Sequence, residues 1–96
     1  MIRITIGYGD YERQANYRYF TDMANADVAV EEIIERASKQ NDRYLDDTVE
    51  FDYEYYDVWS IIVDRFKVKH GEYKRVERIA RYWYNSETNK YEKEEV

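Results

Sequence analysis

The chain has 96 residues and a formal net charge of −6, from 21 acidic and 15 basic residues. This length predicts one compact domain, residues 1–96, with little room for a substrate cleft beside its core. The absence of cysteine excludes disulfides, thiol catalysis and zinc–thiolate sites, and fits a reducing cytoplasm. No signal-peptide core is evident, and no apolar run approaches the roughly 18 residues of a membrane span, so we expect a cytoplasmic protein that does not contact membranes.

The first half of the chain predicts a β-hairpin and a helix. Residues 2–8 alternate apolar and polar side chains, which is typical of a half-buried strand, and a weaker alternation over 15–19 predicts its hairpin partner. Apolar side chains then change to helical spacing at Val30, Ile33, Ile34 and Ala37. This spacing predicts an amphipathic helix over about 27–40, capped by Asn25 or Asp27, with the ion pairs Glu32–Arg36 and Glu35–Lys39.

The second half predicts further strands. Residues 49–55 alternate aromatic or aliphatic side chains with acids, the clearest strand pattern in the chain. Residues 57–66 fit either a helical stripe or a buried strand, and their β-branched run favours the strand. His70 and Gly71 predict a hairpin turn, with His70 exposed to solvent, that leads into a strand over 73–84, although a helix also fits this segment. The residues after it, to Val96, predict a last hairpin.

Together these elements predict the α+β class: an antiparallel sheet of about four to six strands with one amphipathic helix packed on one face. No sequence pattern for catalysis or for a cofactor is evident. Residues 42–53 lack the glycine that a calcium-binding EF-hand loop requires, and His70 is the only histidine. No serine lies in a nucleophile motif, and Gly7 and Gly9 are not followed by the further glycines of a phosphate-binding loop. We therefore expect neither an enzyme nor a metal or cofactor site.

Charge is strongly segmented along the chain. Residues 42–57 contain seven acids and one base, whereas residues 58–84 contain seven bases and three acids. One interpretation is that these two blocks lie on neighbouring strands and neutralise each other in cross-strand pairs. The other is that the acids form an exposed face that attracts a basic partner. The bases and aromatic rings of residues 75–84 are of the kind that contacts single-stranded nucleic acid, but the net negative charge and the adjacent acidic block argue against direct nucleic-acid binding.

The acidic block contains the candidate site. On a strand, Glu50, Asp52 and Glu54 would project to one side at intervals of about 6.6–6.8 Å, close to two steps of about 3.4 Å along a nucleic-acid strand. Such carboxylates would occupy positions that a basic groove uses for phosphates. Tyrosine supplies large contact areas at protein interfaces, and the chain has 12 of them. The candidate contact residues are the acids Asp46, Asp47, Glu50, Asp52, Glu54 and Asp57 and the tyrosines Tyr53, Tyr55 and Tyr56.

This combination of small size, acidity, absence of cysteine and abundant tyrosine resembles the small phage or mobile-element proteins that block host defence nucleases, including anti-CRISPR proteins and antirestriction DNA mimics. The resemblance implies a non-enzymatic inhibitor in the host cytoplasm whose partner is a basic nucleic-acid-binding protein or a nuclease complex. The alternative is a small assembly subunit, such as a homodimer, that associates through an aromatic sheet face or an open edge strand.

Overall fold

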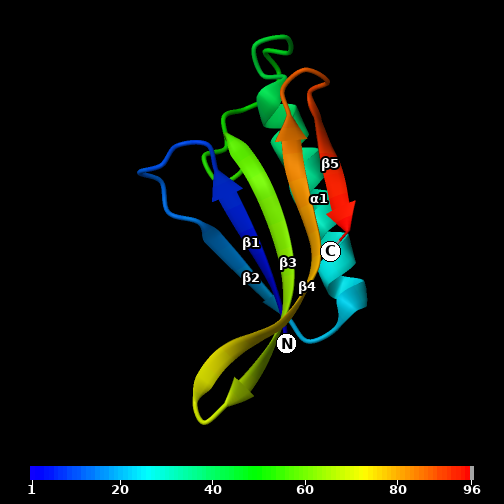
Figure 1. Cartoon of the computed structure of the whole chain (residues 1–96). Coiled ribbons are helices and arrows are strands. Elements are labelled where there is room, and N and C mark those ends of the chain that lie inside the picture. The colour runs from blue at the N-terminus through cyan, green and yellow to red at the C-terminus, as the bar shows by residue number, and fades with distance from the viewer. Residues whose placement is uncertain (96) are drawn as a thin grey trace.

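The protein is a two-layer α+β structure, in which one helix packs on one face of an antiparallel sheet (Figure 1). The computed structural model describes residues 1–95 and the side chains of residues 1–94. The elements in chain order are β1 (Ile2–Tyr8), β2 (Asn16–Phe20), α1 (Met23–Asn41), β3 (Val58–Lys69), β4 (Glu72–Asn85) and β5 (Lys90–Glu95). The predicted fold class is thus confirmed, with five strands; Val96, which was predicted as part of the last strand, lies outside the described residues.

The five strands lie in the order β2-β1-β3-β4-β5, and each neighbouring pair is antiparallel. The three isoleucines of β1 explain its central position, because Ile2, Ile4 and Ile6 all project to the same face and are almost fully buried. Ile4 pairs with Val63 and Ile6 with Ile61, so the β-branched run that left residues 57–66 ambiguous is the neighbouring inner strand β3. The preference for a strand there is confirmed.

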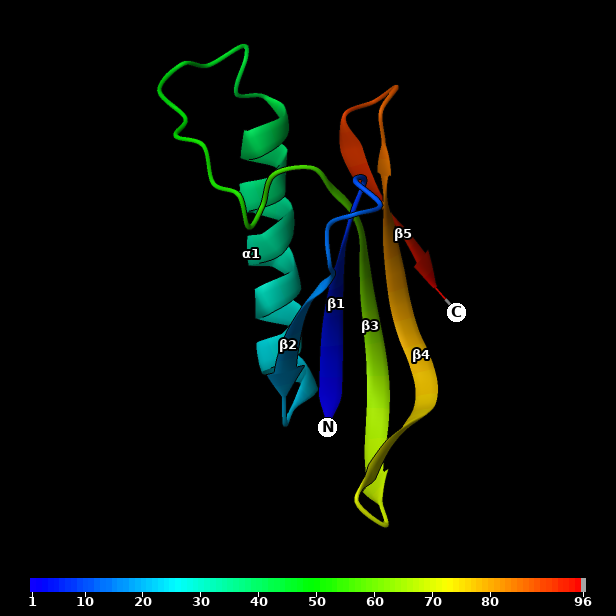
Figure 2. The same ribbon diagram turned by 90° about the vertical axis from the view of Figure 1, so that its left-hand side faces the viewer.

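The helix buries one stripe against the β1 side of the sheet (Figure 2). The stripe consists of Ala26, Val30, Ile33, Ala37 and Gln40, which recur every three or four residues. The helix begins four residues earlier than predicted, and the predicted caps are wrong. Asp22 is the N-cap, because its carboxylate accepts a hydrogen bond of 2.8 Å from the Asn25 amide. The two predicted ion pairs within the helix are confirmed.

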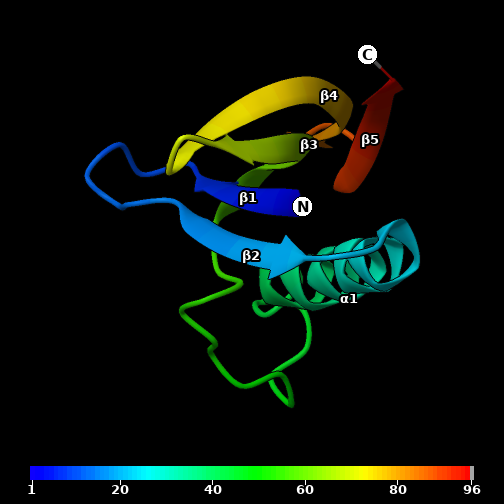
Figure 3. The same cartoon turned by 90° about the horizontal axis from the view of Figure 1, so that it is seen from below.

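The opposite face of the sheet carries no helix, as the views from the side and from below show (Figures 2 and 3). Register places Arg3, Thr5 and Ile62 on this open face. Arg3 lies over the rings of Tyr17 and Phe66, at 4.9 and 4.2 Å from their centroids. Two cross-strand ion pairs, Arg78–Asp64 and Arg81–Glu94, lie on the same face. Arginine stacking and ion pairing therefore cover much of the face that the helix leaves bare.

The β3–β4 hairpin turns at His70 and Gly71, as predicted, and both residues have positive φ values, of 53° and 78°. Two positive φ values are typical of the type I′ turn, whose twist matches that of the flanking strands. His70 is exposed at the tip. The hairpin extends well beyond the rest of the sheet and forms one end of a molecule whose longest dimension is 49 Å (Figure 1).

Candidate functional site

All nine candidate contact residues lie in the connection between α1 and β3, residues 42–57, which we call the acidic loop. The predicted strand over 49–55 is wrong: this stretch consists of turns, a bend and irregular backbone and pairs with no described strand. Glu50, Asp52 and Glu54 therefore do not form a comb with the repeat of a β-strand, and the match to the spacing of phosphates does not apply. The acids nevertheless all lie in one loop, on the helix side of the sheet (Figure 2).

Gln40 explains why the acidic loop is ordered without joining the sheet. The Gln40 side chain is buried at the C-terminal end of the helix, where its Nε2 donates to the Glu50 carbonyl at 2.8 Å and its Oε1 accepts from the Asp52 amide at 3.1 Å. One side chain thus satisfies a donor and an acceptor that a neighbouring strand would otherwise satisfy. The sequence predicts Gln40 only as the last residue of the helix and gives no sign that it holds the loop.

Two further side chains hold the end of the loop. The Tyr8 hydroxyl donates to the Glu54 carbonyl at 2.6 Å, and an Arg13 guanidinium nitrogen donates to the Tyr56 carbonyl at 2.6 Å. Tyr55 is 8% exposed and belongs to the hydrophobic core. The prediction that Tyr55 contacts a partner is therefore wrong, because its side chain packs into the core and anchors the loop there. Of the predicted tyrosines, Tyr53 and Tyr56 are the exposed ones.

The acids of the loop differ in what they contact. Glu54 forms an ion pair with Arg18 of β2. The Asp52 carboxylate accepts from the Glu54 amide at 3.1 Å, and Asp57 lies beside Gly9, whose amide donates to the Asp57 carbonyl at 3.0 Å. Among the described side chains, Asp46, Asp47 and Glu50 are the predicted acids that are exposed and form no ion pair. These three carboxylates are free to meet a partner.

The Asp46 carboxylate is held by a local turn at Thr48. The Thr48 hydroxyl donates to the Asp46 carboxylate at 2.6 Å and the Thr48 amide at 3.0 Å. These two hydrogen bonds hold the pKa of the Asp46 carboxyl below its usual value of 3.8. The local turn thus fixes the position of one carboxylate on the surface of the loop.

Exposed apolar side chains are interleaved with these acids. They are Tyr44, Leu45, Phe51, Tyr53 and Tyr56, all at least 45% exposed. Phe51 lies edge-on to Tyr56 with ring centroids 5.1 Å apart, and the Arg13 guanidinium lies 3.7 Å above the centre of the Tyr53 ring. Sequence reasoning missed Tyr44, Leu45 and Phe51. A signal for two of them was present in the sequence, because Tyr44 and Leu45 are apolar residues in a stretch that is otherwise polar, like a linker.

Among the described side chains, the bases of residues 58–84 form no ion pair with the acidic loop. Three of the four arginines pair elsewhere, Arg65 with Glu77 across the β3–β4 hairpin and Arg78 and Arg81 with Asp64 and Glu94 on the open face. The acidic loop and the tip of the β3–β4 hairpin lie at opposite ends of the molecule (Figures 1 and 2). The interpretation that the two blocks cross-pair on neighbouring strands is therefore wrong, because the acidic loop joins no strand of the described sheet and its Glu54 pairs with Arg18 of β2.

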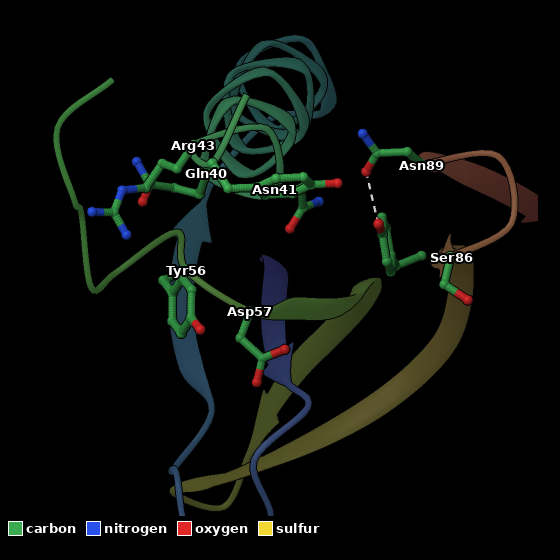
Figure 4. A pocket seen from close by; sticks show the side chains of 9 residues that line it. Gln40, Asn41, Arg43, Tyr56, Asp57, Ser86 and Asn89 are labelled. Atoms are coloured by element: carbon green, nitrogen blue, oxygen red, sulfur yellow. Dashed lines mark hydrogen bonds between the residues drawn. The ribbon is translucent and has the colours of Figure 1, made fainter. Parts of the chain in front are cut away.

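A hollow of about 470 Å³ lies between the acidic loop, the C-terminal end of the helix and the β4–β5 turn (Figure 4). Asp57 is the one carboxylate that lines it, and Arg43 the one cation. On the β4–β5 side of this hollow the Tyr84 hydroxyl donates to Asn89 at 2.7 Å, and Asn89 in turn donates to Asp42 of the loop at 2.6 Å. The polar groups thus tie the loop to the sheet, and they do not form a nucleophile–base pair.

Tyr91 supports the same junction from β5. Its hydroxyl donates to the Val58 carbonyl at 2.7 Å and accepts from the Asn41 side chain at 3.2 Å. Burial raises the pKa of Tyr91 to about 12. The hydroxyl therefore remains protonated at neutral pH and joins the end of the helix to the start of β3.

Three further findings bear on function. Within the described residues, no group of three or more histidine or acidic side chains is arranged to hold a metal ion. The helix of the described structure is not apolar enough to cross a membrane. Comparisons with protein-family models, with curated proteins and with solved structures find no match for this chain.

Proposed function

We propose that this protein is a non-enzymatic inhibitor that binds a basic nucleic-acid-handling protein, such as a host defence nuclease, through its acidic loop. The observation that carries the proposal is the combination of free carboxylates and exposed aromatic rings on one tethered loop. Asp46, Asp47 and Glu50 supply charge, and Phe51, Tyr53 and Tyr56 supply contact area beside it. Aromatic anchors with surrounding charges are typical of protein interfaces, and negative charge selects a basic partner.

The tether supports this proposal because it lowers the cost of binding. A loop held by Gln40, Tyr8 and Arg13 has already lost much of its conformational freedom before a partner arrives. The carboxylates then compete with phosphates for the same lysine and arginine side chains of the partner. Inhibition follows if the groove that binds the loop is the groove that binds nucleic acid.

The experiment is a pull-down from bacterial lysate, at about 0.1 M and about 0.5 M salt, with identification of the captured proteins by mass spectrometry. Screening shortens from about 10 Å toward 3 Å over the range from 0.1 to 1 M salt, so contacts made by exposed charges weaken. The test variant is D46N/D47N/E50Q, which removes three free loop charges and keeps each side chain's shape. The matched control D27N/E31Q/E35Q removes three charges from the exposed side of the helix.

We expect the native chain and the helix control D27N/E31Q/E35Q to capture nucleic-acid-binding proteins at low salt. We expect this capture to be lost with the loop variant D46N/D47N/E50Q and at high salt. Capture of the same proteins by the loop variant would show that the free carboxylates are not the contact. A Tyr53→Ala variant separates charge from aromatic contact, since it leaves all loop acids in place.

A second candidate function is self-association through β2. This edge strand leaves one side of its backbone unpaired, and its Tyr17 and Tyr19 are both exposed on the open face of the sheet. Two copies could join their sheets along this edge. Light scattering distinguishes the candidates, because a stable dimer that captures no other protein would support assembly instead of inhibition.

A further inference from the structure

In the terminal part of the β3–β4 hairpin the two strands pair only with each other and with no other described strand. The pairing of β1 with β3 reaches Arg65, and the last backbone contacts join Met1 to Phe66. On the other side, the described pairing of β5 with β4 begins at Ala80. Residues 67–76, which we call the arm, therefore form a two-stranded ribbon that projects from the sheet (Figure 1).

The arm is basic, and its charges are free. It contains four bases and one acid, Glu72. The bases are Lys67, Lys69, Lys74 and Arg75, all exposed. Among the described side chains none of the four forms an ion pair, whereas Arg65, at the base of the arm, pairs with Glu77. The arm thus presents a local positive field that the chain itself does not neutralise.

The arrangement of the lysines is unfavourable for the isolated chain. Lys67 lies directly opposite Lys74 in the antiparallel register, and like charges at such positions destabilise a hairpin. Alternation places Lys69 on the same face of the ribbon, directly opposite Glu72, and puts Val68 and Tyr73, a cross-strand pair, on the other face. An anion bound between the lysines would relieve this repulsion.

We propose that the arm binds double-stranded DNA by entering the major groove, with its lysine face against the phosphates. A two-stranded β-ribbon fits the major groove, which is about 12 Å wide. The lysine face carries Lys67, Lys69 and Lys74 and one acid, Glu72 opposite Lys69, so its net charge is positive and complements the negative phosphates. The acidic loop of a second copy is a poorer match, because its free acids are interleaved with exposed aromatic rings.

The net charge of −6 does not oppose this interaction, because of where the acids lie. Lys67 follows Asp57 by ten residues of nearly continuous strand, which corresponds to about 33 Å at about 3.3 Å per residue. The screening length is about 10 Å at 0.1 M salt. The field of the acidic loop is therefore largely screened at the arm, although the two segments are neighbours in the sequence.

The experiment measures fluorescence anisotropy of a labelled 20-base-pair DNA duplex, and of one of its strands alone, with the full chain at 50–200 mM salt. The test variant is K67Q/K74Q, and the control K39Q/K90Q removes the same charge from the helix and from β5. If Lys67 and Lys74 each contact one phosphate, the slope of log K against log salt becomes shallower by about 1.8 in the test variant. The control should keep the native slope.

Four results would overturn the proposal. They are the absence of duplex binding at 50 mM salt, an equal loss of binding in the control, binding of the single strand as tight as that of the duplex, and an arm-dependent increase of mass in light scattering without DNA. The last result would assign the arm to a second copy of the chain. Thermal unfolding checks the variant, which should be at least as stable as the native chain because it removes a like-charge pair.

Discussion

Replacing Gln40 by Met tests how the acidic loop is held. Met fills a similar volume but can neither donate to the Glu50 carbonyl nor accept from the Asp52 amide, so both hydrogen bonds of the native side chain are lost. Each such bond contributes about 0.5–1.5 kcal/mol, so we expect the free energy of unfolding to fall by about 1–3 kcal/mol. For a chain of this size, each 1 kcal/mol lowers the melting temperature by about 4–8 °C.

Urea unfolding gives the change in stability, and amide hydrogen exchange locates it. The Asp52 amide should lose its protection in Gln40→Met, because its acceptor is gone. Lys39→Gln, at the neighbouring exposed position, serves as the control and should change stability by no more than about 0.5 kcal/mol. The reasoning is refuted if Gln40→Met unfolds at the native urea concentration and the Asp52 amide stays protected.

Two further predictions concern buried polar groups. Tyr91→Phe should destabilise the fold, because the hydroxyl of Tyr91 donates to the Val58 carbonyl. Burial raises the pKa of Tyr91 to about 12, so the stability advantage of the native chain should persist below pH 10 and shrink as the pH rises toward 12. An advantage that stays constant across this range in thermal unfolding would contradict the prediction. Arg78→Met should lower the free energy of unfolding by about 3–5 kcal/mol, because it leaves Asp64, which is 2% exposed, as an unpaired buried charge. Arg65→Met breaks only an exposed ion pair and should lower it by less than about 1 kcal/mol. Chemical unfolding measures both changes. Equal effects of these two arginine substitutions would contradict the difference in burial.

Much of the fold could be predicted because periodicity reflects burial. The isoleucines of β1 alternate toward the core, and the helix stripe at Val30, Ile33 and Ala37 is buried as its spacing indicates. The β-branched run of β3 settled an ambiguous segment correctly, since a strand buried between two others favours such residues. The start of the helix was missed, because Asp22 caps it before the apolar stripe begins.

The acidic loop shows where periodicity fails. Val49, Phe51, Tyr53 and Tyr55 alternate as in a strand, but of these four only Tyr55 is buried. A strand also needs a partner for its backbone, and here the side chain of Gln40 takes that role. Arginine stacking holds two of the remaining rings outside the core, Arg43 against Phe51 and Arg13 against Tyr53. None of these contacts has a signature in the local sequence.

The charge segments of the sequence define the acidic block, and the structure places that block in one loop between α1 and β3. The arrangement of the candidate site within the loop could not be predicted. Its geometry, the burial of Tyr55 and the exposure of Tyr44 and Leu45 depend on tertiary contacts. The same holds for the arm: proximity in the sequence predicts that its bases pair with the acids, but the fold places the arm far from the acidic loop.

The central claim is that the acidic loop takes the place of nucleic acid on a basic partner. The most direct measurement titrates this protein into a purified captured partner that holds a labelled nucleic-acid substrate, and follows the release of the label. We expect the apparent dissociation constant of the substrate to rise in proportion to the concentration of the native chain, and to rise far less with D46N/D47N/E50Q. Binding of the native chain to the partner with the substrate still fully bound would contradict the claim.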